Sequence, residues 1–286
     1  MKLGLLCSGG LGLKVLDYLF GSNKPVFVFT DRGSIDIIKY CEIKKISLFV
    51  GNPRDGKSGD FINNKEIDLL ISINYLFIIE STLINLPKIL AFNIHGSLLP
   101  KYRGRTPHVW AIINNETKTG ITAHCIDDGF DTGDIIDQVE ISIECNDTGA
   151  DILKKFGDLY IPIVDAVLKK VELKSLRPEK QDETKATYFG KRTPDDGQID
   201  WSWQKERIRN WIRAQSNPYP GAFTYYDSKK IIIDEIRYSD CGYNSSQKNG
   251  TILSVRPLII KTPNGAIEIT KLRTENISFI KNNNLI

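Results

Sequence analysis

The sequence lacks the features that mark disulfide-bonded and zinc-binding proteins. Its 286 residues include five cysteines, an odd number, and no CxxC pair occurs among them. Neither a disulfide framework nor a zinc site is indicated, so we expect no metal and a reduced, cytoplasmic compartment. The cysteines are Cys7, Cys41, Cys125, Cys145 and Cys241.

Long hydrophobic runs are also missing. No apolar stretch approaches the roughly 20 residues that a membrane helix requires. Gly9, Gly10 and Gly12 interrupt the apolar start too early for a signal-peptide core. The hydrophobic share of 41% and the charged share of 26% are typical of a globular protein. We therefore expect no membrane partner.

Neither sign of charge dominates. The net charge of +3 is too small to predict a nucleic-acid partner. Basic residues moderately outnumber acidic ones after residue 200, which would suit an anionic ligand, although a solvated face is the simpler explanation.

Expected strands and helices alternate through the first part of the chain. The expected strands span residues 2–7, 25–31, 67–75, 89–95, 120–127 and 134–143, and the expected helices span residues 11–20, 34–46 and 148–172. This alternation predicts an α/β fold with a parallel sheet covered by helices. Such sheets bind ligands beyond the carboxyl ends of their strands.

The composition changes after these elements. Residues 175–198 are polar and rich in turn formers, which is typical of a linker. A helix is expected at residues 199–215, and short β-rich runs between residues 224 and 280 predict a small barrel or sandwich. We therefore expect two domains, residues 1–195 and residues 196–286.

A glycine-rich turn, SGGLG, follows the first expected strand. Gly10 and Gly12 match the start of a dinucleotide-binding fingerprint, but Val15 occupies the third glycine position, so an NAD site is not predicted. Backbone N–H groups at the start of a helix attract phosphate or carboxylate. The turn is either an anion-facing loop or a simple tight turn.

Asn93 and His95 stand at the carboxyl end of the expected strand at residues 89–95, in a chain with three histidines. Side chains alternate along a strand, so this pair shares one face. A buried polar pair costs free energy unless it is hydrogen bonded. A core histidine bonded to backbone would satisfy the pattern, but the turn that follows, GSLLPKYRGRTP, lies at the expected ligand crevice.

Asp131 lies in a second polar cluster, DDGFDTGD, between two expected strands. The cluster lacks the spacing of a calcium loop, and the chain has no G-x-S-x-G nucleophile motif. An imidazole beside a carboxylate is suited to proton transfer, and a carboxamide can donate to an oxyanion. Asn93, His95 and Asp131 therefore suit acyl transfer to an amine without a covalent enzyme intermediate.

Residues 92–136 resemble the core of the 10-formyltetrahydrofolate-dependent formyltransferases, with Asn93, His95 and Asp131 at the family's catalytic positions and SLLP at its signature turn. The later GQIDW and NPYPGAF motifs are similar to those of the two-domain members. The resemblance implies a Rossmann-like catalytic domain, a smaller OB-like domain, and 10-formyltetrahydrofolate as co-substrate.

The resemblance also implies roles for individual residues. Asn93 would stabilise the tetrahedral oxyanion, His95 would act as base or acid, and Asp131 would orient or charge the imidazole. The segments expected to hold the pterin, largely through backbone, contain Tyr75, Leu76, Ile126, Asp127 and Asp128. Gly9 and Gly10 lie where relatives place the acceptor.

The acceptor amine divides the family. The region beyond residue 200 argues against glycinamide ribonucleotide as substrate, and the absence of a basic insertion after the second strand argues against tRNA. The resemblance is closest to members that act on UDP-linked 4-amino sugars, so a UDP- or dTDP-linked amino sugar is expected. Arg105, and the pair Lys101 and Arg103, could meet a diphosphate or sugar hydroxyls. Tyr219 and Tyr225 could stack on a base or sugar, and packing is the alternative for both.

Three other functions stay open at this point. A methionyl-tRNA formyltransferase shares both domains, a 10-formyltetrahydrofolate hydrolase shares the three polar residues, and a non-catalytic folate-binding protein would share the fold. A homodimer through the second domain would fit such enzymes, although no residue pattern requires it. A nucleotide-linked amino sugar suggests a pathway that makes a surface polysaccharide or a modified sialic-acid-like sugar.

Overall fold

The computed structural model describes residues 1–286, and the chain divides into two compact units. The first unit comprises residues 1–104, 120–140 and 156–188, and the second comprises residues 105–119, 141–155 and 189–286. The second unit thus includes residues 105–119, 141–155 and 189–195 of the region that the sequence assigns to one catalytic domain. A boundary at residue 195 stays a prediction.

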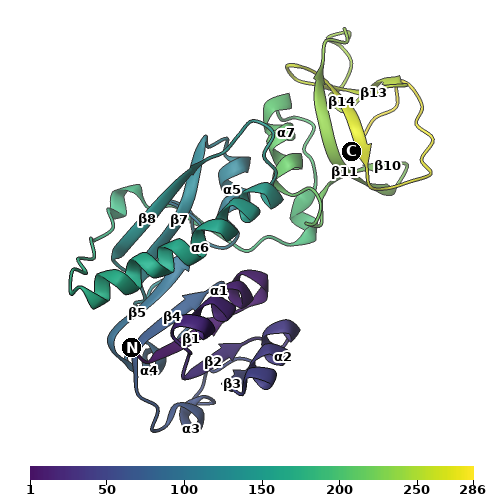
Figure 1. Ribbon diagram of the computed structural model, residues 1–286. Coiled ribbons are helices and arrows are strands. Elements are labelled where there is room, and N and C mark those ends of the chain that lie inside the picture. The colour runs from purple at the N-terminus through teal and green to yellow at the C-terminus, as the bar shows by residue number, and fades with distance from the viewer. The chain divides into compact units, whose positions relative to one another are not determined.

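A seven-stranded sheet, ordered β3-β2-β1-β4-β5-β7-β8, forms the framework of the first unit (Figure 1). Its strands are β1 (Leu3–Cys7), β2 (Phe27–Thr30), β3 (Ser47–Val50), β4 (Ile67–Ile73), β5 (Pro87–His95), β7 (Lys118–Cys125) and β8 (Ile135–Ser142). The α/β class is confirmed. β3 was missed in the sequence because it is a four-residue edge strand whose residues are only partly buried.

The sheet is parallel on one side and changes direction at β5. The pairs β1–β2, β2–β3, β1–β4 and β4–β5 are parallel, whereas β5 and β7 are antiparallel. The expectation of a wholly parallel sheet is therefore wrong for β7. A parallel neighbour requires a crossover, usually by a helix packed on the sheet. The only helix between β5 and β7 is the seven-residue α5 (Pro107–Ile113), which belongs to the second unit.

Three of the four longest helices of the chain match those expected before the linker. They are α1 (Gly9–Ser22), α2 (Ile35–Lys44) and α6 (Gly149–Glu172), and two single-turn helices, α3 (Gly59–Ile62) and α4 (Ser81–Ile84), accompany them. α1 contacts α6 through polar side chains: Tyr18 donates to Asp165 at 2.6 Å, and Lys14 donates to the carbonyl of Gly157 at 2.7 Å. No helix is both long and apolar enough to cross a membrane.

Aromatic packing fills one side of the parallel strands. Phe27 and Phe29 are fully buried, and both rings contact Phe61 edge-on. Gly4 of β1 permits this packing, because a Cβ atom there would lie 2.6 Å from a ring carbon of Phe27. The ring of Phe27 thus occupies the space that a side chain at position 4 would need.

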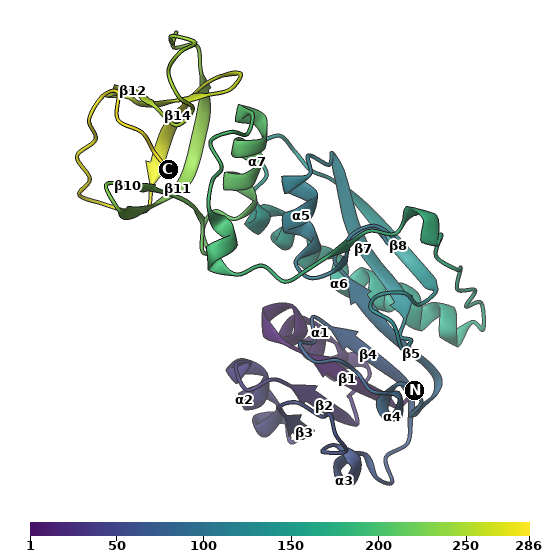
Figure 2. The same cartoon turned by 180° about the vertical axis from the view of Figure 1, so that it is seen from behind.

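The second unit contains an antiparallel sheet ordered β10-β11-β14-β13-β12 (Figure 2). The strands are β10 (Ala222–Tyr226), β11 (Lys229–Ser239), β12 (Ile252–Val255), β13 (Leu258–Thr262) and β14 (Gly265–Leu272), and the helix before them is α7 (Lys205–Ala214). A β-rich C-terminal region is confirmed. Its likeness to an OB fold stays a prediction.

Gly4→Ala should destabilise the protein, because the added methyl group collides with the buried ring of Phe27. Overpacking of this kind costs about 1–3 kcal/mol. Gly21→Ala is the matched control: no atom lies within 4 Å of its Cβ position on α1, and alanine favours a helix by up to about 1 kcal/mol. Urea unfolding measures both variants, and equal stability of the two would contradict the packing described here.

Candidate active site

Strand register brings four polar side chains together at the junction of β5 and β7. Asn93 pairs with His124 and His95 pairs with Thr122 across the antiparallel ladder. Residues two apart on a strand point to the same face, so Asn93 and His95 share a face, as the sequence predicts. His95 and His124 are buried, at 7% and 3% exposure, and Asn93 is half-buried.

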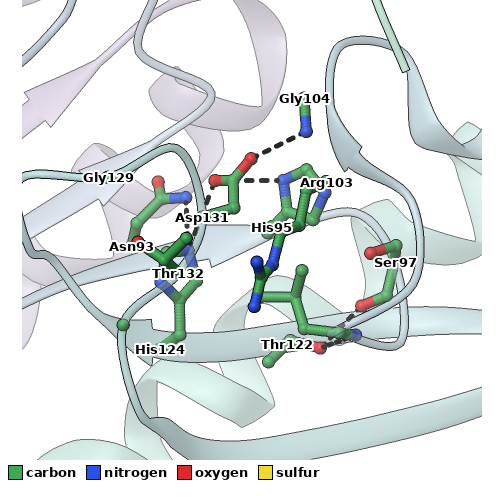
Figure 3. A network of polar contacts seen from close by, with 12 residues as sticks. Asn93, His95, Ser97, Arg103, Gly104, Thr122, His124, Gly129, Asp131 and Thr132 are labelled. Atoms are coloured by element: carbon green, nitrogen blue, oxygen red, sulfur yellow. Dashed lines mark hydrogen bonds and ion pairs between the residues drawn. The ribbon is translucent and has the colours of Figure 1, made fainter. Parts of the chain in front are cut away.

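The loop between β7 and β8 carries Asp131 to these side chains (Figure 3). Asp131 Oδ1 lies 3.5 Å from His95 Nδ1 and 3.5 Å from His124 Nε2. Asp131 Oδ2 accepts a hydrogen bond from the N–H of Gly104 at 2.9 Å. One carboxylate therefore faces two imidazole rings, and the structure brings Asn93, His95 and Asp131 into one cluster.

Local chemistry explains the path of this loop. Asp131 has a left-handed backbone, with φ of 57°, a conformation that aspartate tolerates better than most residues. A Cβ atom at Gly133 would lie 1.9 Å from the carbonyl oxygen of Cys125, so the loop can approach β7 only with glycine there. Asp127 accepts from the N–H of Gly129 and from the hydroxyl of Thr132. These contacts fix the turn that presents Asp131.

Backbone carbonyls determine which ring nitrogens carry protons. His95 Nε2 lies 2.8 Å from the carbonyl of Tyr102, and His124 Nδ1 lies 2.8 Å from the carbonyl of Cys125. A carbonyl only accepts, so each of these nitrogens carries a hydrogen. In neutral His124 the Nε2 atom then accepts from Asn93 Nδ2 at 3.1 Å. His124 thereby orients the carboxamide of Asn93, whose NH₂ group keeps a second hydrogen for another oxygen.

The electrostatics of the cluster favour a neutral His95 beside an ionised Asp131. Burial is the largest influence on His95 and lowers its pKa; Asp131 and the carbonyl of Tyr102 oppose it in part. Burial alone would raise the pKa of Asp131, but His95, His124 and the N–H of Gly104 together hold that pKa well below its ordinary range. At neutral pH the imidazole is thus available to accept a proton, and the adjacent carboxylate stabilises the imidazolium that results.

Thr122 and His124 were missed as site residues in the sequence. Both lie in the expected strand at residues 120–127, where they were treated as ordinary strand residues. Their spacing of two, opposite another polar pair, was the available signal. Thr122 Oγ1 donates to the carbonyl of Ser97 at 2.6 Å and accepts from Leu99 N and Gln138 Nε2. Thr122 thus fixes the turn that follows β5.

The residues expected to hold the pterin lie after β4 and β7. Tyr75 and Ile126 both pack against one buried apolar cluster, so the structure brings these two segments to a common region. The hydroxyl of Tyr75 is buried without a hydrogen-bond partner. Leu76 is 44% exposed, and Asp127 and Asp128 are exposed. Pterin contact by these five residues stays a prediction.

The expected acceptor residues are divided between the two units. Gly9 and Gly10 line a cavity of about 130 Å³ at the starts of α1 and α2, and the N–H of Gly9 donates to Ser34 Oγ at 2.9 Å. Arg105, which is exposed, and Tyr219 belong to the second unit. The hydroxyl of Tyr219 lies 2.8 Å from His108 Nε2. Acceptor contact by these residues stays a prediction.

Arg103 requires a correction. The sequence treats it as a turn residue that could meet a diphosphate, but its side chain is fully buried. Its guanidinium donates to Glu183 and Gln181 within the first unit. The guanidinium of Arg103 is therefore already hydrogen bonded within the chain. The expectation that Arg103 meets a diphosphate or sugar hydroxyls is wrong. Lys101 is exposed.

Comparison with known proteins places the chain in a family. Residues 28–166 match the formyl transferase model, and residues 191–284 match the model for the formyl transferase C-terminal domain. The chain belongs to the formyltransferase family. This family member is 35% identical, over 302 aligned residues, to the bifunctional polymyxin resistance protein ArnA of Wigglesworthia glossinidia brevipalpis. The alignment covers 99% of the chain but only 44% of that relative.

Solved structures share the fold of this chain. The N-formyltransferase of Helicobacter canadensis, in complex with folinic acid and dTDP-3-aminofucose, has a TM-score of 0.72 and 22% identity, over 94% of this chain and 98% of that one. WlaRD, a sugar 3N-formyl transferase in the presence of dTDP and 5-N-formyl-THF, has a TM-score of 0.69 and 24% identity, over 95% and 98%.

Asp131→Asn should make stability less dependent on acid. The folded state lowers the pKa of Asp131 from its ordinary 3.8, so the carboxylate contributes stability above about pH 4 and loses it as the pH falls through the folded pKa. Between pH 7 and pH 3, the free energy of unfolding should therefore fall less in the variant than in the wild type. Urea titrations at both pH values measure this. Equal losses would show that Asp131 is not held by the two histidines.

Proposed function

We propose that the protein transfers the formyl group of 10-formyltetrahydrofolate to the amine of a nucleotide-linked amino sugar. One observation carries the proposal: Asn93, His95 and Asp131 meet at the carboxyl end of β5, where His124 orients the amide and Asp131 faces the imidazole. Membership of the formyltransferase family supplies the reaction class.

The cluster suits direct attack of an amine on a formyl carbon. A new C–N bond forms as the carbonyl electron pair moves to oxygen, and the free hydrogen of the Asn93 carboxamide can donate to that oxyanion. The attacking amine loses a proton to the His95–Asp131 pair. The oxyanion then collapses, the bond between carbon and N10 of the folate breaks, and N10 receives a proton from the same pair. No covalent enzyme intermediate is required.

The co-substrate assignment draws on the family and on the apolar surroundings of the site. Two of the solved structures hold a formylated folate, named as folinic acid or 5-N-formyl-THF. In this chain, Tyr75 and Ile126 join one apolar cluster, and the segments that contain them follow the ends of β4 and β7. A flat pteridine requires such apolar contact together with backbone donors and acceptors.

The acceptor class draws on two solved structures that align with nearly the whole chain. The two sugar N-formyltransferase structures align over nearly their whole length, and both hold dTDP or a dTDP-linked sugar. The sequence offers no basic insertion for tRNA after the second expected strand. A nucleotide-linked amino sugar, carried by UDP or dTDP, is the acceptor that these observations favour.

His95→Asn should reduce kcat for formyl transfer by about 10²–10⁴-fold, because the variant loses the proton acceptor beside Asp131. Binding of folinic acid and the unfolding midpoint should change little, since asparagine is smaller and polar. Stopped assays of formyl transfer, with calorimetry for folinic acid, measure the two effects. Activity within a few-fold of wild type would remove His95 from the chemistry.

A competition between acceptors tests the substrate class. The enzyme is given 10-formyltetrahydrofolate with a panel of UDP- and dTDP-linked 3-amino and 4-amino sugars, charged initiator tRNA, and no acceptor. One or more amino sugars should be formylated with kcat/KM at least about tenfold above that for tRNA. Preferential formylation of the tRNA would contradict the proposal. Equal formate release with and without an amine would instead indicate a hydrolase.

A further inference from the structure

The segment at residues 179–188, here called the strap, is attached to both loops that carry the site. The sequence predicts that it is part of a linker. In the structure, Glu179 exchanges two backbone hydrogen bonds with Ile135, next to the Asp131 loop. Thr187 accepts from the N–H of Tyr102 through its hydroxyl and from the N–H of Arg103 through its carbonyl. The strap therefore connects the Asp131 loop with the loop that contacts His95.

Gln181 lies at the centre of this connection. Its Nε2 donates to the carbonyl of Asp131 at 2.8 Å and to the carbonyl of Gly133 at 2.7 Å. Its Oε1 accepts from the Nε of Arg103 at 3.1 Å and from a terminal nitrogen at 2.7 Å. The carboxamide of Gln181 thus donates both of its hydrogens to the Asp131 loop, and its oxygen accepts from Arg103 in the loop after β5.

Arg103 extends the connection to the rest of the strap. Its two terminal nitrogens donate to the two carboxylate oxygens of Glu183 at 2.9 and 2.6 Å, and one also donates to the hydroxyl of Tyr188. A bidentate pair of this kind fixes orientation as well as charge. Because Arg103 follows Tyr102 and precedes Gly104, its backbone joins the residues that contact His95 and Asp131.

The two loops adopt costly backbone conformations where the strap holds them. Tyr102 has φ of 61° and Asp131 has φ of 57°. This left-handed conformation costs about 1 kcal/mol or more for a residue such as tyrosine, and less for aspartate. The N–H of Tyr102 donates to the hydroxyl of Thr187, and the carbonyl of Asp131 accepts from the carboxamide of Gln181. Each unfavourable backbone is therefore compensated by a hydrogen bond from the same segment.

We propose that Gln181 is a positioning residue, which holds the Asp131 carboxylate against His95 by hydrogen bonding both loops at once. The inference rests on the proposed function for its meaning in catalysis, but the positioning itself is a property of the free protein. Only a carboxamide satisfies all four hydrogen bonds. Glutamate keeps the oxygen toward Arg103 but places a second oxygen against two carbonyls, and methionine fills the space without donors.

The test compares Gln181→Met and Gln181→Glu with Thr184→Ala. Thr184 lies on the strap, but its hydrogen bonds go to Asp182, within the strap, so its variant controls for disturbance of the strap itself. Labelling with ¹³C-histidine gives three ring signals to follow against pH, because the chain has three histidines. Single substitutions of each histidine assign the signals.

The expected NMR result has a definite direction. The charged groups that face His95 are Asp131 and, if protonated, His124, with the carbonyl of Tyr102 on the third side. Asp131 raises the pKa of His95 against the larger effect of burial. When the carboxylate is no longer held, the pKa of His95 should fall in both Gln181 variants and stay at the wild-type value in Thr184→Ala.

The activity result separates positioning from a general structural role. Misplacement of catalytic groups by about 1 Å costs up to about 10²-fold in rate, so kcat should fall about 10–100-fold while KM for the folate changes little. The unfolding midpoint should fall moderately, because both variants leave the carbonyls of Asp131 and Gly133 without their donor. Unchanged His95 titration and unchanged kcat would overturn the proposal. Loss of folate binding together with a large drop in stability, in both Gln181 variants, would also overturn it.

The two proposals fail in different ways. If the wild type transfers no formyl group to any acceptor, the proposed function is wrong, and a shifted His95 titration in the Gln181 variants still supports positioning. If the wild type is active but the titration and kcat of the Gln181 variants match those of Thr184→Ala, positioning by Gln181 is wrong and the proposed function stands.

Discussion

The carboxylate of Asp131 is the interaction on which the site depends. It faces two imidazoles at 3.5 Å and accepts a backbone N–H from the loop after β5. A negative charge in a half-buried place is unfavourable unless it is compensated. Here the compensation comes from the groups that a proton transfer needs, so the contacts that make the charge tolerable also set the state of His95. The same contacts of Asp131 therefore serve both the stability of the fold and the proposed proton transfer.

The sequence predicted the parts of the site that follow from local periodicity. Asn93 and His95 share a face because side chains alternate on a strand, and their place at a carboxyl end follows from the α/β pattern. Thr122 and His124 obey the same rule, but their meaning depends on β7 pairing antiparallel with β5. Nothing in the local pattern fixed that pairing, because it depends on where the chain travels between the two strands.

Other features were beyond local pattern for a different reason. Asp131 reaches the histidines through a left-handed backbone and through the absence of a side chain at Gly133, and both are properties of tertiary approach. Arg103 was expected at the surface because charged residues on turns usually are, yet Glu183, 80 residues later, neutralises it. The polar, turn-rich composition of residues 175–198 likewise gave no indication that Gln181 contacts both loops of the site. The polar loop between two expected strands and the family resemblance both indicated Asp131, but neither indicated the contacts of Arg103 or Gln181.

The antiparallel ladder of β5 and β7 limits how this protein can vary in length. All four polar side chains of the ladder depend on the two-residue alternation of their strands, so one residue inserted into either strand upstream of them would turn its pair to the opposite face of the sheet. Insertions and deletions can accumulate in the turns on either side, whereas the interior of these two strands should tolerate substitution but no change in residue number. In related chains, gaps should therefore be absent between positions 92 and 95 and between positions 122 and 125.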